Sequence, residues 1–490
     1  MASLQIGNGL LTESESTPLI AESPCQYGVS NRNSRSEALV PFLVLPISFL
    51  AAFSIAVTAA SSIFSYAQLI CKDPTHCRDS EMNKYAGSVA IASILANVCG
   101  VLALGYFEKL SRHHRQRGLG IWILCRSMSV FMLALGVYLR SITVAISGRV
   151  FQGLASDNLL HFNLNALYVQ NTSSTHTSTL IGASLALFML GISIGPAVAS
   201  LFQGVFISFF LALGVFSFTF LYLVLFIPTN ANVKGQNEQS AVGDELSLSE
   251  SSGKNWELSW QPFRSLATII LSPLMPFYTR SASLASGVAL FLYNMAQSYI
   301  FSLIMVHTSL SFGFSSRENG ILISIVHLVS ALYMFIVLFG IPRLMRRYHL
   351  RGSSELRTSN LHRSIGRDAV FALISLGTQT VALVGFANAT KTWEIYVLSA
   401  VFALGLATPS FIKSHFLGFF REEEATTAMG ALTMVEVLGS LLSPLLLGGW
   451  QSMWPGTEVF YVASGFMLVT LCFFSISASV LRNSPVDGDA

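Results

Sequence analysis

Long apolar stretches separated by short polar ones run along most of this 490-residue chain. A helix needs roughly 20 mostly apolar residues to cross a bilayer, where it satisfies its own backbone hydrogen bonds. The pattern predicts twelve membrane-spanning helices, over residues 40–66, 84–107, 119–139, 142–168, 178–201, 204–227, 282–307, 319–341, 369–388, 394–419, 428–450 and 457–480. We therefore expect an all-α integral membrane protein.

Polar segments divide the chain into predicted domains. Residues 1–38 are polar and rich in Ser, which predicts a disordered cytosolic tail. Residues 228–281 have the composition of a cytosolic linker, and their last part is amphipathic, as expected of a segment that lies on the membrane surface. The predicted layout is a six-helix bundle over 39–227, the linker, a second six-helix bundle over 282–482 and a short cytosolic tail over 483–490.

Three short sequence pairs recur in the same order in the two predicted bundles. They are "GYFEKLSRHHR" from Gly105 with "GIPRLMRRYHLR" from Gly340, "GLASD" from Gly153 with "GLATP" from Gly405, and "LGISIGP" ending at Pro196 with "LGSLLSP" ending at Pro444. Internal repeats of this kind predict two pseudo-symmetric halves, which is the layout of a transporter whose halves rock against each other.

The few charged residues predict how the chain is oriented. Only 11% of the residues are charged, whereas a soluble domain has about 25%. Basic residues concentrate in the loops at 108–118 and 343–367, and such loops face the cytosol. Both termini are then cytosolic. The net charge of +3 gives no reason to expect a nucleic-acid partner.

The fourth predicted span contains Arg149, Asp157 and His161. A charge inside a bilayer costs a few kcal/mol or more, so we expect these groups to face a cavity. Asp157 and His161 are four residues apart and share one helix face. Carboxylate and imidazole groups can take up and release protons, whereas Arg149 is always charged and could stabilise a carboxylate in one state and release it in another. The alternative is a buried network that only holds helices together.

Three further polar residues in predicted spans are candidates for the same pathway. Arg126 either extends to the cytosolic surface or reaches the cavity. Glu436 is the acid deepest in the second half, and Asn294 lies in the seventh span, where it contacts either substrate or another helix. Near the cytosolic end of the tenth span, we expect Lys413 to pair with the acids at 422–424.

Sequence features outside the membrane predict processing and location. Cys71 and Cys77 lie in the first exterior loop, where oxidising conditions permit a disulfide. Asn388 begins a glycosylation sequon in another exterior loop. The tail contains an acidic dileucine pattern formed by Glu15, Leu19 and Ile20, which is either a sorting signal or inert. We expect the plasma membrane or a vacuolar or endolysosomal membrane.

Two sequence signatures resemble those of the major facilitator superfamily. The R-x-x-Q-G signature of its fourth helix matches Arg149, Gln152 and Gly153, and the G-x-x-x-G-P signature of its fifth helix matches Gly191, Gly195 and Pro196. Glycines four residues apart let helices approach closely, and proline bends a helix. These residues are expected to pack the fifth helix and to seal the outer side of the cavity.

The third signature of that family, in the loop after the second helix, is degraded. Glu108 and Lys109 replace its Asp and Arg, while Leu104 and Ser111 replace two glycines, which puts its role as a gating latch in doubt. The resemblance implies a twelve-helix fold, and the fifth-helix signature implies an exporter that exchanges substrate for protons, with the signature arginine in proton transfer. A finer similarity links the chain to the tetracycline-exporter and proton-coupled folate carrier groups. Fungal gene clusters for secondary metabolites often encode transporters of this kind.

Enzymatic chemistry has no support in the sequence. It contains no phosphate-binding P-loop, nucleophile elbow or zinc-protease helix, and no Cys or His grouping typical of a metal site. We predict a monomeric secondary active transporter with no cofactor, which uses the proton gradient to export a small organic molecule or secondary metabolite. The alternatives are a proton-coupled uptake carrier of a small organic anion and a membrane scaffold or receptor that does not transport.

Overall fold

The computed structural model describes residues 40–74, 77–113, 115–171, 174–202, 204–227, 277, 281–340, 357–420 and 422–483. Every regular element in these ranges is a helix, which confirms the all-α prediction. Nearly all of the predicted tails and linker lies outside the described residues. The sorting pattern of Glu15, Leu19 and Ile20 lies outside them too.

Eight helices form the N-terminal half. They are α2 (Val40–Val57), α3 (Ala59–Ile70), α4 (Asp79–His113), α5 (Arg115–Tyr138), α6 (Ile142–Leu154), α7 (Asp157–Asn171), α8 (Ser174–Ser200) and α9 (Val205–Phe226). The first predicted span comprises α2 and α3, which Thr58 separates. The fourth predicted span likewise comprises two helices, α6 and α7.

The described part of the C-terminal half contains long α-helices, short α-helices and two short π-helices. They are α12 (Ser281–Phe312), α13 (Ser316–Phe335), the π-helix η2 (Ile336–Gly340), α15 (Arg357–Asn388), α16 (Thr392–Ala403), α17 (Thr408–Leu417), α18 (Glu422–Ser443), the π-helix η3 (Pro444–Gly448), α19 (Gly449–Met453) and α20 (Glu458–Asn483). Eleven stretches in the described ranges are long and apolar enough to span a membrane. The twelfth remains a prediction because α6 and α7 have only 13 and 15 residues.

Both halves contain a helix break at the repeated sequence GLASD or GLATP. At the break between α6 and α7, the Ser156 carbonyl accepts the Leu160 N–H at 3.3 Å and also the Trp122 indole N–H at 2.8 Å. At the break between α16 and α17, the Gly405 carbonyl accepts the Thr408 N–H at 3.1 Å and also the hydroxyls of Tyr293 at 3.2 Å and Thr408 at 2.6 Å. Side chains thus supplement the backbone hydrogen bonds where each helix is interrupted. The repeat therefore marks one structural device that is present in both halves.

The repeated sequences LGISIGP and LGSLLSP produce equivalent helix packing in the two halves. A Cβ atom at Gly191 of α8 would lie 2.6 Å from the Phe49 carbonyl oxygen of α2. A Cβ atom at Gly439 of α18 would lie 2.6 Å from the Phe291 carbonyl oxygen of α12. Only a residue without a side chain permits these approaches. The two halves therefore share an internal packing arrangement, as their sequence repeat predicts.

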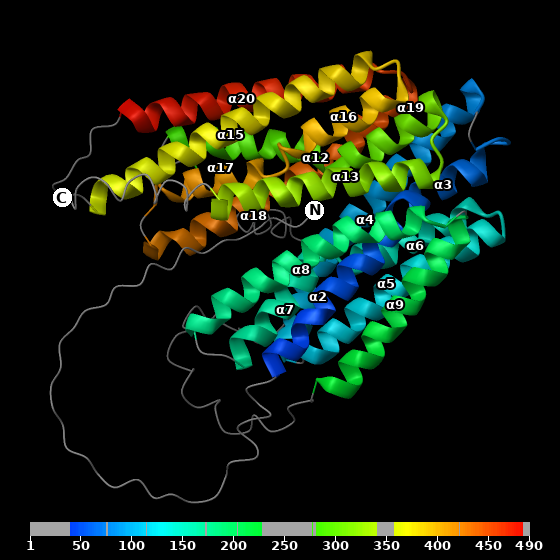
Figure 1. Cartoon of the computed structure of the whole chain (residues 1–490), viewed down its shortest axis with the longest axis horizontal. Coiled ribbons are helices and arrows are strands. Elements are labelled where there is room, and N and C mark those ends of the chain that lie inside the picture. Colours follow the sequence, from blue (N-terminus) through cyan, green and yellow to red (C-terminus); the bar gives the residue numbers. More distant parts are fainter. Residues whose placement is uncertain are drawn as a thin grey trace, which may run out of the picture.

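The two halves meet near one end of the molecule and separate toward the other. We call the end where a disulfide joins Cys71 to Cys77 the disulfide end, and the end where α4 meets α5 the basic end. Figure 1 shows the helix groups in contact near α3 and α19 and diverging away from them. At the disulfide end, the Ser61 and Ser316 hydroxyls of opposite halves lie 2.8 Å apart. This contact closes the interface on that side.

Candidate functional site

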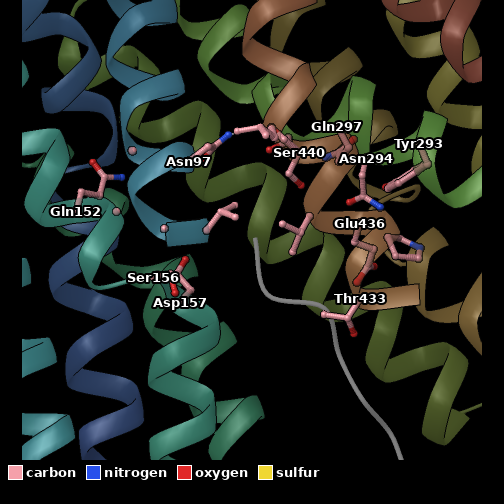
Figure 2. Close-up of a pocket in the computed structure, with 18 of the residues that line it drawn as sticks. Asn97, Gln152, Ser156, Asp157, Tyr293, Asn294, Gln297, Thr433, Glu436 and Ser440 are labelled. Carbon is pink, nitrogen blue, oxygen red and sulfur yellow. The ribbon is translucent and has the colours of Figure 1, made fainter. Parts of the chain in front are cut away.

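A cavity of about 340 Å³ lies between the two halves near the middle of the molecule. Its polar lining comes from both halves, as Figure 2 shows: Asn97, Gln152, Ser156 and Asp157 from the first, and Tyr293, Asn294, Gln297, Thr433, Glu436 and Ser440 from the second. Arg126 of the first half also belongs to this lining. Asn97 also donates a hydrogen bond to the Ser440 carbonyl at 2.8 Å across the interface. We call this space the central cavity. It brings together Arg126, Gln152, Asp157, Asn294 and Glu436, which sequence analysis had singled out separately.

Arg126 and Asp157 form an ion pair on the first wall of the central cavity. Asp157 is the first residue of α7, so the positive end of the helix dipole also stabilises its carboxylate. The Arg126 guanidinium lies 5.6 Å from the centre of the Trp122 ring, a cation–π distance. Arg126 therefore reaches the cavity rather than the cytosolic surface, which decides between the two alternatives that the sequence left open.

Lys413 and Glu436 form a second ion pair on the opposite wall. The Lys413 ammonium nitrogen, on α17, lies 2.8 Å from a Glu436 carboxylate oxygen on α18, and both residues are buried. We expected Lys413 to pair with the acids at 422–424, and the structure pairs it with Glu436. The side chains at 422–424 lie outside the described ones, so a contact with them stays a prediction.

Each half therefore presents one carboxylate to the central cavity and balances it with a basic residue of its own. A buried pair is strongly affected when one partner loses its charge, because the other is left uncompensated. Protonation of Asp157 or Glu436 would release its basic partner. The arrangement can thus couple the protonation of a cavity acid to a rearrangement of the wall that contains it.

Arg149 lies beside a second cavity of about 200 Å³, which also includes Arg126 and Gln152 in its lining. Its Nε donates a hydrogen bond to the Tyr66 hydroxyl at 3.1 Å, and its Nη1 donates to Gln152 Oε1 at 2.6 Å. The Tyr66 ring centre is 5.5 Å from the guanidinium carbon. Arg149 and Gln152 of the R-x-x-Q-G signature therefore contact each other, three residues apart on α6. We call this space the arginine cavity.

His161 lines neither of these cavities. Its ring packs edge-on against Phe188 of α8, with ring centres 4.6 Å apart. The helix break explains its separation from the cavity, because α7 begins at Asp157 and directs the following turn toward α8. The place of His161 in the proton pathway stays a prediction.

The signature glycines pack helices within the first half. A Cβ atom at Gly153 would lie 2.7 Å from the Cys99 Cβ atom of α4, and one at Gly195 would lie 2.9 Å from the Ala56 Cβ atom of α2. Pro196 follows directly, and its carbonyl oxygen would lie 3.1 Å from a Cβ atom at Gly320 of the second half. The fifth-helix signature therefore reaches the interface near the disulfide end, where we expected it to seal the cavity.

For Glu108 and Lys109, the structure describes the backbone but not the side chains. Glu108 and Lys109 belong to the last part of α4, toward the basic end. Their role as a latch stays a prediction.

Asn388 at the end of α15 is exposed, and its side chain donates to the Val384 carbonyl and accepts from the Tyr461 hydroxyl. Its glycosylation also stays a prediction.

Sequence analysis missed several residues that shape the site, chiefly Tyr66, Trp122, Tyr293 and Lys413 in its cavity role. Aromatic residues are common in membrane helices, so their presence alone carries no functional signal. Their contacts join helices that are distant in sequence, as between Tyr66 on α3 and Arg149 on α6. The repeat of GLASD as GLATP was one usable signal. It indicates that the helix after Gly405, like the helix after Gly153, carries a charged residue of the site.

Comparison with known proteins agrees with this architecture. A sequence model of the Major Facilitator Superfamily matches residues 42–354. The human organic anion transporter MFSD10 (TETRAN) has a similar structure, with 16% sequence identity, a TM-score of 0.52 and coverage of 91% of this chain and 100% of that one. The nucleoside transporter NupG is similar too, with 14% identity, a TM-score of 0.53 and coverage of 91% and 100%. No curated protein sequence matches the chain significantly. At these identities the two structures indicate the fold alone.

Proposed function

Because the chain belongs to the Major Facilitator Superfamily, we propose that this multi-pass membrane transporter is a secondary active exporter that exchanges a small organic molecule for protons. The observation that supports the proposal best is the central cavity with its two ion-paired carboxylates, one from each half. A scaffold has no use for ionisable groups in the middle of a membrane, since they are costly there.

The contacts between the halves support a mechanism of alternating access. The halves touch at the disulfide end, through Ser61 and Ser316 and through Pro196 and Gly320. They separate toward the basic end, which the loop charges assign to the cytosol (Figure 1). Substrate then enters from the cytosol. Rocking of the halves opens the disulfide end and closes the basic end.

Proton exchange follows from competition within the cavity. In the state described here, Asp157 and Glu436 are each paired with a basic residue. When the cavity opens to an acidic exterior, we expect a proton to replace the basic partner on at least one of them, and substrate to leave. Return to the cytosolic side re-forms the pair and releases the proton. The chain's own residues thus supply the coupling, and the proton gradient supplies the energy.

The test is transport in proteoliposomes with a controlled pH difference. The purified chain would be given a panel of amphiphilic drugs and microbial metabolites, with and without a proton ionophore. The proposal predicts that a pH gradient drives substrate toward the acidic compartment and that the ionophore abolishes the accumulation. Movement of substrate together with protons, away from the acidic side, would instead establish an uptake carrier. No movement of any compound across the panel would contradict transport itself.

Sorting signals determine the membrane in which the protein is located. We propose the plasma membrane or a vacuolar or endolysosomal membrane. In either, proton exchange drives export only where the compartment opposite the cytosol is the more acidic one. Fluorescent tagging of the full chain, with and without substitution of Glu15, Leu19 and Ile20 by Ala, distinguishes the two.

A further inference from the structure

Arg149 is a buried cation without a carboxylate partner among the described residues. Only 9% of its surface is exposed, and its contacts are the neutral groups of Tyr66 and Gln152. Its Nη2 atom makes no hydrogen bond in the described part of the chain. An uncompensated charge at this depth is costly, and buried charges are usually paired. The structure therefore leaves room for an anion beside Arg149.

Arg126 supplies a second, independent sign of a missing acceptor. Its Nη2 atom is paired with Asp157, but its Nε atom is buried and has no hydrogen-bond partner among the described residues. Arg126 and Arg149 both line the arginine cavity, and no acidic residue lines it. Two guanidinium groups with unused donors therefore border one cavity.

The charges around the two cavities do not cancel. The cationic side chains are Arg126, Arg149 and Lys413, and the anionic ones are Asp157 and Glu436. Three positive and two negative charges leave a net charge of +1, which belongs to Arg149 because the other four form pairs. One monovalent anionic group restores neutrality.

The remaining lining indicates what kind of molecule bears that group. The arginine cavity is bordered by the apolar side chains of Ile55, Ile63, Val130, Leu133, Phe216 and Met305 and by the hydroxyls of Thr58, Ser62, Ser129 and Ser302. Its volume of about 200 Å³ is several times the roughly 30 Å³ that one water molecule occupies in the liquid. A monatomic ion would leave most of this space unfilled, whereas a compact organic acid would fill it.

We propose that the arginine cavity binds a compact organic monocarboxylate, with its carboxylate on Arg149 and its apolar body against the surrounding side chains. This inference rests on the proposed transport function, for which it names the substrate class. Arginine suits the role because its planar donors match the two oxygens of a carboxylate. Arg126 adds a second positive charge to the lining, and Gln152 holds Arg149 in place from one turn along the same helix.

Direct binding to the purified full-length chain tests the proposal without transport. The probe is radiolabelled benzoate, which combines a carboxylate with a compact apolar ring, measured by scintillation proximity. Unlabelled benzoate and benzamide serve as competitors, because benzamide keeps the ring and shape but has no charge. We expect benzoate to displace the probe at concentrations at least about ten-fold lower than benzamide, since a hydrogen bond to a charged group is worth more than a neutral one.

Three variants assign the binding to Arg149. Arg149→Gln removes the charge, Arg149→Lys keeps it without the planar fork, and Arg317→Gln removes a charge of the same kind at an exposed position as the matched control. We expect Arg149→Gln to weaken benzoate binding roughly ten- to a hundred-fold, Arg149→Lys to weaken it less, and Arg317→Gln to leave it unchanged. Unfolding temperatures without ligand identify any variant that fails to fold.

Four outcomes would overturn the proposal. Benzamide competes as well as benzoate, a folded Arg149→Gln binds benzoate like the wild type, or the wild type binds no benzoate. In the fourth, chloride displaces the probe at lower concentrations than benzoate does, which identifies the occupant as an inorganic ion.

Failure of the inference and failure of transport remain distinguishable. If a neutral or cationic compound is exchanged for protons in proteoliposomes while benzoate does not bind, only the inference fails; benzoate binding without any flux contradicts the transport proposal instead.

Discussion

Asp157 and Glu436 line the same cavity from opposite halves of the chain, and each is paired with a basic residue of its own half. Both carboxylates therefore depend on a partner that moves with them, not on one across the interface. Rocking of the two halves leaves the pairs intact unless a proton or a substrate intervenes. In the proposed exchange mechanism, the charge state of the cavity would therefore determine when the halves rock.

The Lys413–Glu436 pair predicts a non-additive effect on stability. Glu436→Gln leaves the buried Lys413 ammonium without its 2.8 Å partner, and we expect the free energy of unfolding to fall by about 3 kcal/mol. The double variant Lys413→Met with Glu436→Leu removes both charges and is expected to recover most of that loss. Unfolding in detergent with a thiol-reactive dye measures both. Glu458→Gln, at an exposed acid, is the control. Equal loss in the single and double variants would contradict the pairing.

The fifth-helix signature predicts a difference between two otherwise identical substitutions. Gly191→Ala places a Cβ atom 2.6 Å from the Phe49 carbonyl oxygen, so α8 must move away from α2. We expect a loss of about 1–3 kcal/mol in unfolding free energy. Gly214→Ala on α9 meets no atom within 4 Å and removes a flexible residue from a helix, so it is expected to be neutral or slightly stabilising. Similar unfolding temperatures for the two variants would show that α8 and α2 do not pack closely.

The closed disulfide end predicts a cross-link that stops transport. Ser61→Cys and Ser316→Cys together, in a background without Cys25, Cys99, Cys125 and Cys472, are expected to form a disulfide on mild oxidation, because the two hydroxyls lie 2.8 Å apart. A protease site placed within residues 228–276 separates the halves on a gel unless they are cross-linked. Oxidation is expected to abolish substrate flux, and reduction to restore it. Full flux through the cross-linked protein would show that this end does not open.

Glycosylation of Asn388 tests the orientation that the basic loops predict. Asn388 is exposed at one end of α15, and the charge pattern places that end outside the cytosol. We expect treatment with an N-glycosidase to shift the mobility of the wild type but not of Asn388→Gln. The sequon at Asn171 lies at the opposite end of the bundle and serves as the internal control. Glycans on Asn171 with none on Asn388 would reverse the assigned orientation.

Most of the fold followed from the spacing of apolar residues. Segments of roughly 20 such residues have only one way to cross a bilayer, so span existence and order were predictable. The break between α6 and α7 was not, because Gly153, Ala155 and Ser156 also occur within continuous membrane helices. The sequence pointed to the break only through its repeat at Gly405, where Pro409 lies in the first turn of the next helix.

The site was predictable residue by residue but not pair by pair. The cost of charge in lipid singled out Arg126, Asp157 and Glu436 without any structure. Their partners depend on how α5, α7, α17 and α18 pack, which apolar spacing does not encode. The Lys413–Glu436 pair was therefore not predicted. For the same reason, the R-x-x-Q-G signature did not reveal that Arg149 contacts Tyr66 and has no acid beside it among the described residues.

The most direct test of the account is substrate-evoked proton movement in proteoliposomes that contain a pH-sensitive dye. A transported compound would be added to the wild type, to Asp157→Asn, to Glu436→Gln and to the control Glu458→Gln. The account predicts proton flux opposite to substrate flux in the wild type and the control. It predicts a large loss of that proton flux in at least one of the two cavity variants, with substrate still bound. Proton flux of wild-type size in both folded cavity variants would contradict the claim that the paired carboxylates carry the proton.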